Sequence, residues 1–595
     1  MFRFLIGSLM KMSGFYSWIA LTVIGTLWAM AIHAQELQPI EFENLRVYGE
    51  LETRSLRNYD RLESDIYWPD NVFPVAHEGP SAGWPGDYEG RIILGLTLQA
   101  QALHREPKYL SELINRIDAR VNERGYLGPV MRDSILEQQL SGHGWLLRGL
   151  CEYYEWKKDE RVKRHIHNII TNLALPTRGY HRLYPIDPDQ RRHDVGEASG
   201  TTQNAIGNWL LSSDIGCDFI FMDGVIHAYS LFPDPEVKAL VEEMIQRFLQ
   251  MDLVGIKAQT HATLTALRGL LRYYSLTGES YLLEEAVERY ALYHGQAITE
   301  NFENFNWFGR PEWTEPCAIV DAFMVATQLW QYTGKPGYLE DAHRMYYNAL
   351  GHSQRENGGF GLDNCPNLKD GTLTVYADEA YWCCTMRGGE GLASAVRYNY
   401  FLDGEKGVYV PFFHSSEVRL DIGAGEMVLQ QKSGYPYQGD MELEVLDTKV
   451  EYNMIRLHLF MPEWAESPTV TVNDEPASFR KERGFAVLDT KLQKGDRIRY
   501  AFTMIPRIQQ LSNQTLQGSG YGKVVYGPLV MGHQGRKIQQ LSDKAVFHRL
   551  DNNRWQLEGK EVIQFSPVFH VLSPEVKEKS GYQKQIIFEV PSDYK

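Results

Sequence analysis

A helix–turn–helix unit recurs along the first two thirds of the chain and limits what the chain can fold into. Apolar residues between about 84 and 400 are mostly three or four positions apart, as on the buried face of a helix. The units turn at Thr277-Gly278 and Thr333-Gly334, where glycine can take the positive φ that ends a helix, and a looser copy turns near 157–159. Such hairpins bury their faces against one another. We predict a closed (α/α)6 toroid, with an open solenoid as the alternative.

The hydrophobic period changes after about Gly404. Ile455, Leu457 and Leu459 alternate with polar residues, and similar segments follow, separated by turns. A period of two is typical of antiparallel β-sandwiches. We therefore predict a mainly α protein with an all-β C-terminal part: an N-terminal leader at 1–34, an (α/α)6 barrel with an N-terminal strand extension at 35–403, and β-sandwich structure at 404–595.

The first 34 residues have the pattern of a secretory signal peptide. Arg3 and Lys11 precede an apolar run at about 18–32, and Ala31 or Ala34 offers a cleavage site. The alternative is an uncleaved signal anchor, because the run is only somewhat short for a membrane span. We expect an exported protein, periplasmic or extracellular, that meets a membrane only through this segment.

Charge argues against a nucleic-acid partner. The 595 residues carry 60 Lys and Arg against 76 Asp and Glu, a formal net charge of −16. Binding to the phosphate backbone needs clustered cations, and the chain has no long basic run. We therefore expect no DNA or RNA partner.

Six cysteines are few for a chain of this length, and two of them are neighbours. Adjacent Cys383 and Cys384 are poorly placed to form a disulfide with each other. They follow 66 residues after Cys317, which stands two positions after Glu315. Three thiols and a carboxylate suit tetrahedral zinc. From spacing alone, buried structural cysteines are an equal alternative.

These motifs resemble glycoside hydrolase family 127 and its relatives. The resemblance is carried by Glu315-Pro316-Cys317, by Tyr381-Trp382-Cys383-Cys384, by the Thr-Gly hairpins and by a tail containing Gly527-Pro528-Leu529-Val530. It covers about residues 40–580. Members of that family are zinc-dependent β-L-arabinofuranosidase-like enzymes, so the resemblance implies an exported zinc glycosidase that acts on plant-polysaccharide oligosaccharides of the pectic type.

The resemblance also implies roles for individual residues. Glu315, Cys317, Cys383 and Cys384 would bind zinc, and Cys383 would also attack the anomeric carbon. Metal binding deprotonates a thiol, and the thiolate is the nucleophilic form. The reaction would then be a retaining double displacement through an S-glycosyl intermediate.

The family places a catalytic acid about fifteen residues before the Glu-x-Cys motif. Glu300 has the better spacing, and Glu303 is the second choice, as acid or as a sugar ligand. A catalytic acid needs a pKa raised by burial or by a like charge.

Other positions match residues that line the family's sugar pocket. His143, His227 and His261 would donate hydrogen bonds to sugar hydroxyls, although a lone histidine is often structural. The chain departs from the family after Cys384, where it reads Thr-Met-Arg-Gly-Gly-Glu. Arg387 in this stretch suits a carboxylated sugar.

Two other classes remain open from the sequence. Polysaccharide lyases and unsaturated-uronate hydrolases also combine α/α toroids with β-sandwiches, but they do not rely on a cysteine cluster. A non-catalytic carbohydrate-binding protein with a structural zinc site is the other possibility, since fold does not imply function.

Overall fold

The computed structural model describes residues 37–591 except 75–82, 192, 405–406, 423–424, 450–453, 517–519, 536, 539, 543–545, 552, 559–562 and 570–582. The leader predicted at 1–34 lies outside the described residues. Within the described ranges, no helix is both long and apolar enough to cross a bilayer.

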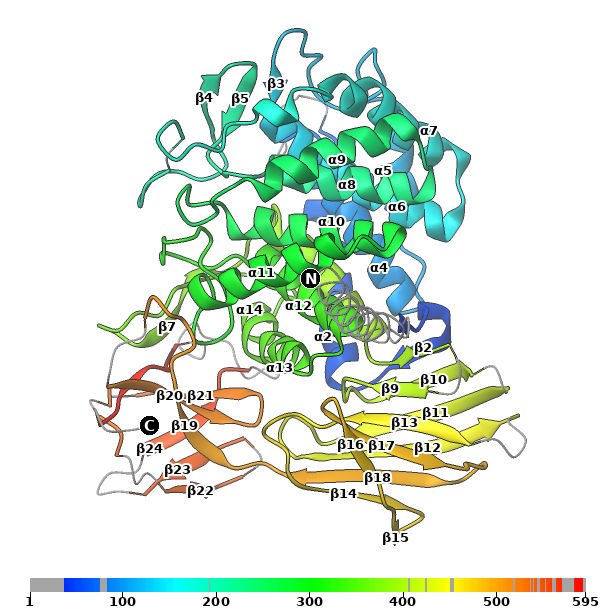
Figure 1. The fold of residues 1–595 in the computed structure, drawn as a ribbon, viewed down its shortest axis with the longest axis vertical. Coiled ribbons are helices and arrows are strands. Elements are labelled where there is room, and N and C mark those ends of the chain that lie inside the picture. Colours follow the sequence, from blue (N-terminus) through cyan, green and yellow to red (C-terminus); the bar gives the residue numbers. More distant parts are fainter. Residues whose placement is uncertain are drawn as a thin grey trace, which may run out of the picture.

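Helices fill the upper part of Figure 1, and sheets lie below them. The inner helices are α4 (Asp87–Ala102), α6 (Glu137–Lys157), α8 (Asp218–Leu231), α10 (Thr260–Thr277), α12 (Pro316–Thr333) and α15 (Cys384–Arg397). Each contacts the next in this order, and α15 returns to contact α4. This return confirms the closed toroid and excludes the open solenoid.

Each inner helix has an outer partner. These partners are α5 (Leu110–Ile117), α7 (Glu160–Ile169), α9 (Pro235–Leu249), α11 (Ser280–Gln296), α13 (Gly337–Arg344) and, packed against α15, α2 (Glu50–Leu62). The inner helices are buried on nearly all sides, whereas α5 and α7 bury a single stripe and expose the rest. Inner and outer helices alternate along the chain and run in opposite directions, so all the inner helices point the same way.

The Thr-Gly turns end two inner helices, as predicted. Helix α10 ends at Thr277 and α12 at Thr333, and the next residues, Gly278 and Gly334, have φ of +71° and +66°. A left-handed residue at this position closes a helix, and glycine adopts it without a steric penalty.

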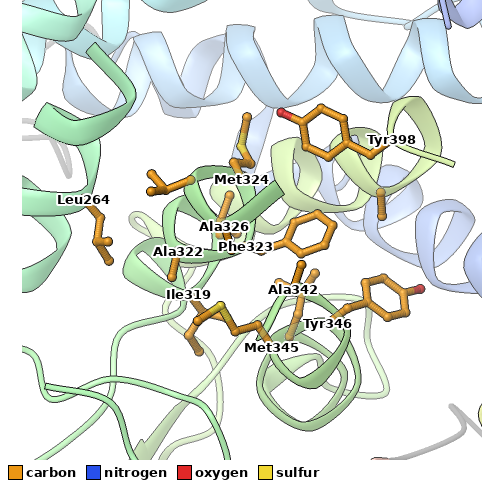
Figure 2. Packing of buried hydrophobic residues seen from close by; sticks show 14 of the residues in the cluster. Leu264, Ile319, Ala322, Phe323, Met324, Ala326, Ala342, Met345, Tyr346 and Tyr398 are labelled. Carbon is orange, nitrogen blue, oxygen red and sulfur yellow. The ribbon is translucent and has the colours of Figure 1, made fainter. Parts of the chain in front are cut away.

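Aromatic and aliphatic side chains fill the space between α12, α15 and η6 (Met345–Leu350), the π-helical turn that follows α13 (Figure 2). The ring of Phe323 on α12 lies 6.1 Å from those of both Tyr346 and Tyr398. This packing fixes α12 against α15, and these two helices carry the cysteine motifs.

Two sheets form the predicted sandwich. One contains, in order, β1 (Gln38–Pro39), β8 (Phe401–Leu402), β9 (Gly407–Val410), β13 (Ile455–Phe460), β17 (Phe485–Thr490) and β16 (Arg480–Glu482). The other contains β15 (Glu475–Pro476), β14 (Glu466–Val472), β18 (Arg497–Thr503), β12 (Asp440–Thr448), β11 (Glu426–Ser433), β10 (Ser416–Asp421) and β2 (Leu45–Val47). Pairing is antiparallel except between β9 and β13. Strands β1 and β2 come from the N-terminal segment, which therefore joins both sheets.

A third sheet connects the C-terminal region to the toroid. It contains β22 (Phe547–Arg549), β23 (Trp555–Leu557), β24 (Ile563–Pro567), β21 (Leu529–His533), β25 (Lys584–Gln585), β7 (Thr372–Ala377) and β6 (Leu362–Asn364), with β19 (Pro506–Gln510), β20 (Tyr521–Tyr526) and β26 (Phe588–Glu589) alongside. Strands β6 and β7 lie in the chain between α12 and α15, so this sheet includes a segment of the toroid. A small sheet of β3 (Ile135–Leu136), β5 (Trp209–Ser212) and β4 (Thr202–Ile206) lies at the opposite end in Figure 1.

Candidate active site

A cavity of about 750 Å³ lies where the inner helices begin. Its wall includes residues from the start of all six: Asp87 and Arg91 on α4, Ser141 on α6, Cys217 and Ile220 at α8, His261 on α10, Glu315 before α12, and Cys383 and Cys384 at α15. The shared direction of the inner helices explains why residues so far apart in sequence meet at one end of the toroid.

The predicted ligand set is assembled at this cavity. One ligand atom from each of Glu315, Cys317, Cys383 and Cys384 lies within 4.8 Å of the other three. The Cys384 sulfur is 3.6 Å from that of Cys317 and 3.3 Å from that of Cys383. All three cysteines are free thiols. The sequence therefore correctly predicted that these residues come together.

Cys383 is the most exposed thiol of this cluster. It is partly exposed, whereas Cys317 and Cys384 are buried. Hydrogen bonds from the thiols of Cys317 and Cys384 lower the pKa of Cys383 to about 6. Cys383 also caps the N-terminus of α15, where the helix dipole favours an anion. The accessible sulfur is therefore the one most readily ionised.

The other three candidate ligands favour their protonated forms. Burial raises the pKa of Cys317 to about 11, that of Cys384 well above its usual value, and that of Glu315 as well. A divalent cation would offset the charge of these groups. Three sulfurs and a carboxylate oxygen are a donor set that tetrahedral zinc accepts, so the residues fit a zinc ion.

Arg91 and His261 surround the ligands. Arg91 donates to the Cys317 sulfur at 3.4 Å and makes two further hydrogen bonds to Asp87, at 2.7 and 2.9 Å, while its guanidinium lies over the Trp145 ring. Nδ1 of His261 lies 3.3 Å from a Glu315 oxygen, and the ring stacks on Trp145. Such outer contacts orient ligands. His261 also lines the cavity, as the sequence predicted.

The structure does not bring His143 or His227 to the cavity wall. His143 is buried in α6, accepts from the amide of Leu127 at 3.1 Å, and has a pKa lowered to about 4 by burial. His227 lies near the far end of α8, between Arg148 and Glu155. Their partners are protein groups, which corrects the expectation that they contact sugar.

Glu300 is also away from the cavity. Its carboxylate pairs with Lys523 at 2.8 Å and accepts from the amides of Ser512 and Asn513, both at 2.9 Å. All of these partners belong to the C-terminal region. Glu300, the residue expected to be the catalytic acid, therefore forms a buried contact between the toroid and the C-terminal region.

Glu303 lies in a separate buried cluster. It is near His352, which pairs with Asp363 at 2.8 Å. Burial and the Asp363 charge raise the pKa of Glu303 to about 8, but Glu303 is not part of the cavity wall. A raised pKa alone therefore does not make it a catalytic acid.

Arg387 is wholly buried in α15 and does not face the cavity. It pairs with Asp321 at 2.5 Å and with Glu390. Its guanidinium lies over the Trp145 ring. The expectation that Arg387 binds a sugar carboxylate is corrected, because internal carboxylates already occupy it.

Sequence reasoning missed several wall residues. Gln259, Asn306 and Asp214 line the cavity, and so does Arg91. Gln259 donates to Glu315 at 3.4 Å. The available signal was position: once the inner helices are predicted, polar residues in or just before their first turns are expected to meet at one end.

Aromatic side chains form part of the cavity wall. Trp313 and Tyr376 stack in parallel, with ring centroids 5.7 Å apart and planes 2° apart. Trp382 is 45% exposed and Tyr376 56%. Flat apolar surfaces beside a polar cluster are suited to sugar rings.

Comparisons with known proteins agree with this arrangement. The family description "Beta-L-arabinofuranosidase, GH127 middle domain" matches residues 407–504. A solved β-arabinofuranosidase of the same family is similar over 94% of this chain and 98% of its own, at 15% identity and a TM-score of 0.69. A β-L-arabinofuranosidase from Geobacillus stearothermophilus T6 is similar over 92% and 100%, at 14% identity and a TM-score of 0.64. A third solved structure, described as "Glycoside hydrolase", is similar over 94% of this chain and 98% of its own, at 13% identity and a TM-score of 0.68. No curated protein sequence matches significantly.

Proposed function

We propose that this chain, which resembles glycoside hydrolase family 127 in residues 407–504 and in fold over nearly its whole length, is an exported, zinc-dependent retaining β-L-arabinofuranosidase. The observation that carries the proposal is the cluster of Glu315, Cys317, Cys383 and Cys384 at a cavity to which Cys383 is open.

In this mechanism, Glu315, Cys317, Cys383 and Cys384 would hold the zinc. When bound, zinc keeps the ligating thiols as thiolates. Cys383 would attack the anomeric carbon because its sulfur is the accessible one of the cluster and it stands at the N-terminus of α15, where the helix dipole favours an anion. Arg91 and His261 keep Cys317 and Glu315 oriented.

The substrate is a furanoside at the end or side branch of a plant-polysaccharide oligosaccharide of the pectic type. The exposed rings of Tyr376 and Trp382 support an oligosaccharide. Arg91 is the sole Arg or Lys of the described cavity wall, and Asp87 already neutralises it. We therefore expect neutral sugars to be preferred over uronic acids.

The test compares wild type with Cys383→Ser on a panel of aryl furanosides and pectic oligosaccharides. We expect turnover of an arabinofuranoside by wild type and its loss in the variant, with folding retained. Cys151→Ser is the matched control, because Cys151 is a buried free thiol on α6 outside the cluster. Undiminished turnover in Cys383→Ser contradicts the thiolate mechanism.

A further inference from the structure

Retaining glycoside cleavage needs a second group besides the nucleophile. It must protonate the leaving oxygen and then activate water, and in most glycosidases it is a carboxyl group. Glu300 and Glu303 are both absent from the cavity wall. The proposed function therefore lacks its acid unless another carboxyl group faces the sugar.

The described cavity wall contains three carboxyl groups: Asp87, Asp214 and Glu315. Arg91 binds both oxygens of Asp87, at 2.7 and 2.9 Å. Glu315 belongs to the ligand cluster. Asp214 has no cationic partner among the described residues, and its carboxylate accepts one hydrogen bond there, to Oδ1 from the amide of Gly200 at 3.3 Å. Asp214 is therefore the carboxyl group left to react.

Asp214 also lies on the correct side of the cavity. It stands four residues before α8, and Cys383 stands directly before α15. In the ring order α4, α6, α8, α10, α12, α15, helices α8 and α15 are three steps apart and so face each other across the centre. A sugar between them would present opposite faces to Cys383 and Asp214. In a double displacement, nucleophile and acid act from opposite sides.

The local structure holds Asp214 in place. Its amide donates to the Ser212 hydroxyl at 3.1 Å, and its carbonyl accepts from the amide of Cys217. The residue is 9% exposed. Burial and the nearby charge of Glu315 raise its pKa to about 7. At neutral pH the Asp214 carboxyl group is therefore protonated in a large share of the molecules, as a proton donor requires.

We propose that Asp214 is the catalytic acid and base of this enzyme, acting across the cavity from Cys383. This inference rests on the proposed function. In the first step, the Cys383 thiolate forms a C–S bond, the glycosidic C–O bond breaks, and the leaving oxygen takes the proton of Asp214. In the second step, the Asp214 carboxylate takes a proton from water, the water oxygen bonds to the anomeric carbon, and the C–S bond breaks to release the thiolate.

The experiment uses zinc-loaded, full-length Asp214→Asn and two aryl arabinofuranosides, one with a phenol and one with a dinitrophenol leaving group. We expect kcat/KM for the phenyl substrate to fall by about 10²–10⁴-fold. The dinitrophenyl substrate needs little protonation, so its kcat/KM should fall far less. Added azide, which needs no general base, should restore turnover and yield a glycosyl azide of retained configuration.

Controls separate this inference from the function on which it rests. Asp214→Asn should unfold at the same temperature as wild type. Equal losses on both substrates without azide rescue would overturn the role of Asp214, as would unchanged activity. If Cys383→Ser is inactive on the dinitrophenyl substrate while Asp214→Asn behaves as wild type, the furanosidase proposal survives and Asp214 is excluded. If wild type cleaves no furanoside, both proposals fail.

Discussion

The sulfur atoms of Cys317 and Cys384 lie 3.6 Å apart although 67 positions separate them in the chain. They meet because Cys317 lies in the first turn of α12 and Cys384 begins α15, and these two helices are neighbours in the ring. The candidate metal site therefore depends on how the toroid closes rather than on a local loop.

Metal content tests this site directly. We expect close to one zinc per chain in purified protein, and Cys317→Ser or Glu315→Ala should lower the zinc affinity because each removes a ligand. Elemental analysis after dialysis against a weak chelator measures this. Cys151→Ser should keep its zinc. Zinc retention in the ligand variants would show that the metal binds elsewhere.

The reactivity of Cys383 should depend on its neighbours. In metal-free protein, we expect iodoacetamide to alkylate Cys383 with a half-maximal rate near pH 6, the value to which the adjacent thiols lower its pKa. Cys384→Ala removes a donor and should raise this midpoint, whereas Cys384→Ser retains a hydroxyl donor and should change it less. Peptide mass spectrometry identifies the alkylated residue. A midpoint above pH 8 in wild type would contradict this assignment.

We expect Glu300 to contribute to the stability of the fold rather than to catalysis. Glu300→Gln leaves Lys523 buried without a charged partner, and breaking a buried ion pair costs about 3–5 kcal/mol. We expect a lower unfolding temperature in this variant and in Lys523→Met, with recovery in the double variant, where no unpaired charge remains. If Glu300→Gln instead folded as wild type and lost turnover, Glu300 would be the acid that the family resemblance implies.

The cluster of Glu303, His352 and Asp363 predicts a loss of stability at high pH. Burial opposes the charged form of His352, but Asp363 outweighs it and raises the pKa of His352 to about 9, while Glu303 has a pKa of about 8. Both groups bind protons more tightly in the folded state. The stability that Glu303 contributes should therefore be complete below about pH 4.5 and be lost as pH rises to about 8, and that of His352 should be lost between about pH 6.5 and 9, by up to about 1.4 kcal/mol per pH unit for each proton. Glu303→Gln should flatten the decline between pH 4.5 and 8 in denaturant titrations, and an unchanged slope would exclude Glu303 as its source.

Arg387 should not select acidic sugars. Arg387→Met leaves Asp321 and Glu390 short of one buried cation, so we expect a lower unfolding temperature. Any loss in kcat/KM should be equal for neutral and carboxylated glycosides. The ratio of the two kcat/KM values is the measurement. A selective loss on the carboxylated substrate would restore the role that the sequence predicted.

The architecture could be predicted because its signals are local and repeated. The Thr-Gly turns at 278 and 334 and the alternation at Ile455 to Leu459 each report nearby backbone structure. The closure of the ring was an expectation from hairpin number and family resemblance. The contact between α15 and α4 settles it.

The clustering of Glu315 with Cys317, Cys383 and Cys384 was predictable because few residue types offer sulfur to a metal. His143, His227 and Arg387 were less predictable, because their chemical types serve buried ion pairs as well as sugars. Glu300 has the spacing of a catalytic acid, yet its partners Ser512, Asn513 and Lys523 lie more than two hundred positions away. No local pattern reports such partners. Asp214 was missed because its place on the cavity wall depends on which helix faces α15.

Helix α15 both returns to α4 and contributes Cys383 and Cys384. A growing polypeptide that ends before this helix has Glu315 and Cys317 but neither the last two thiols nor a closed ring. The ring and the candidate ligand cluster therefore become complete together, late in synthesis. An incomplete chain therefore presents only two of the four candidate ligands.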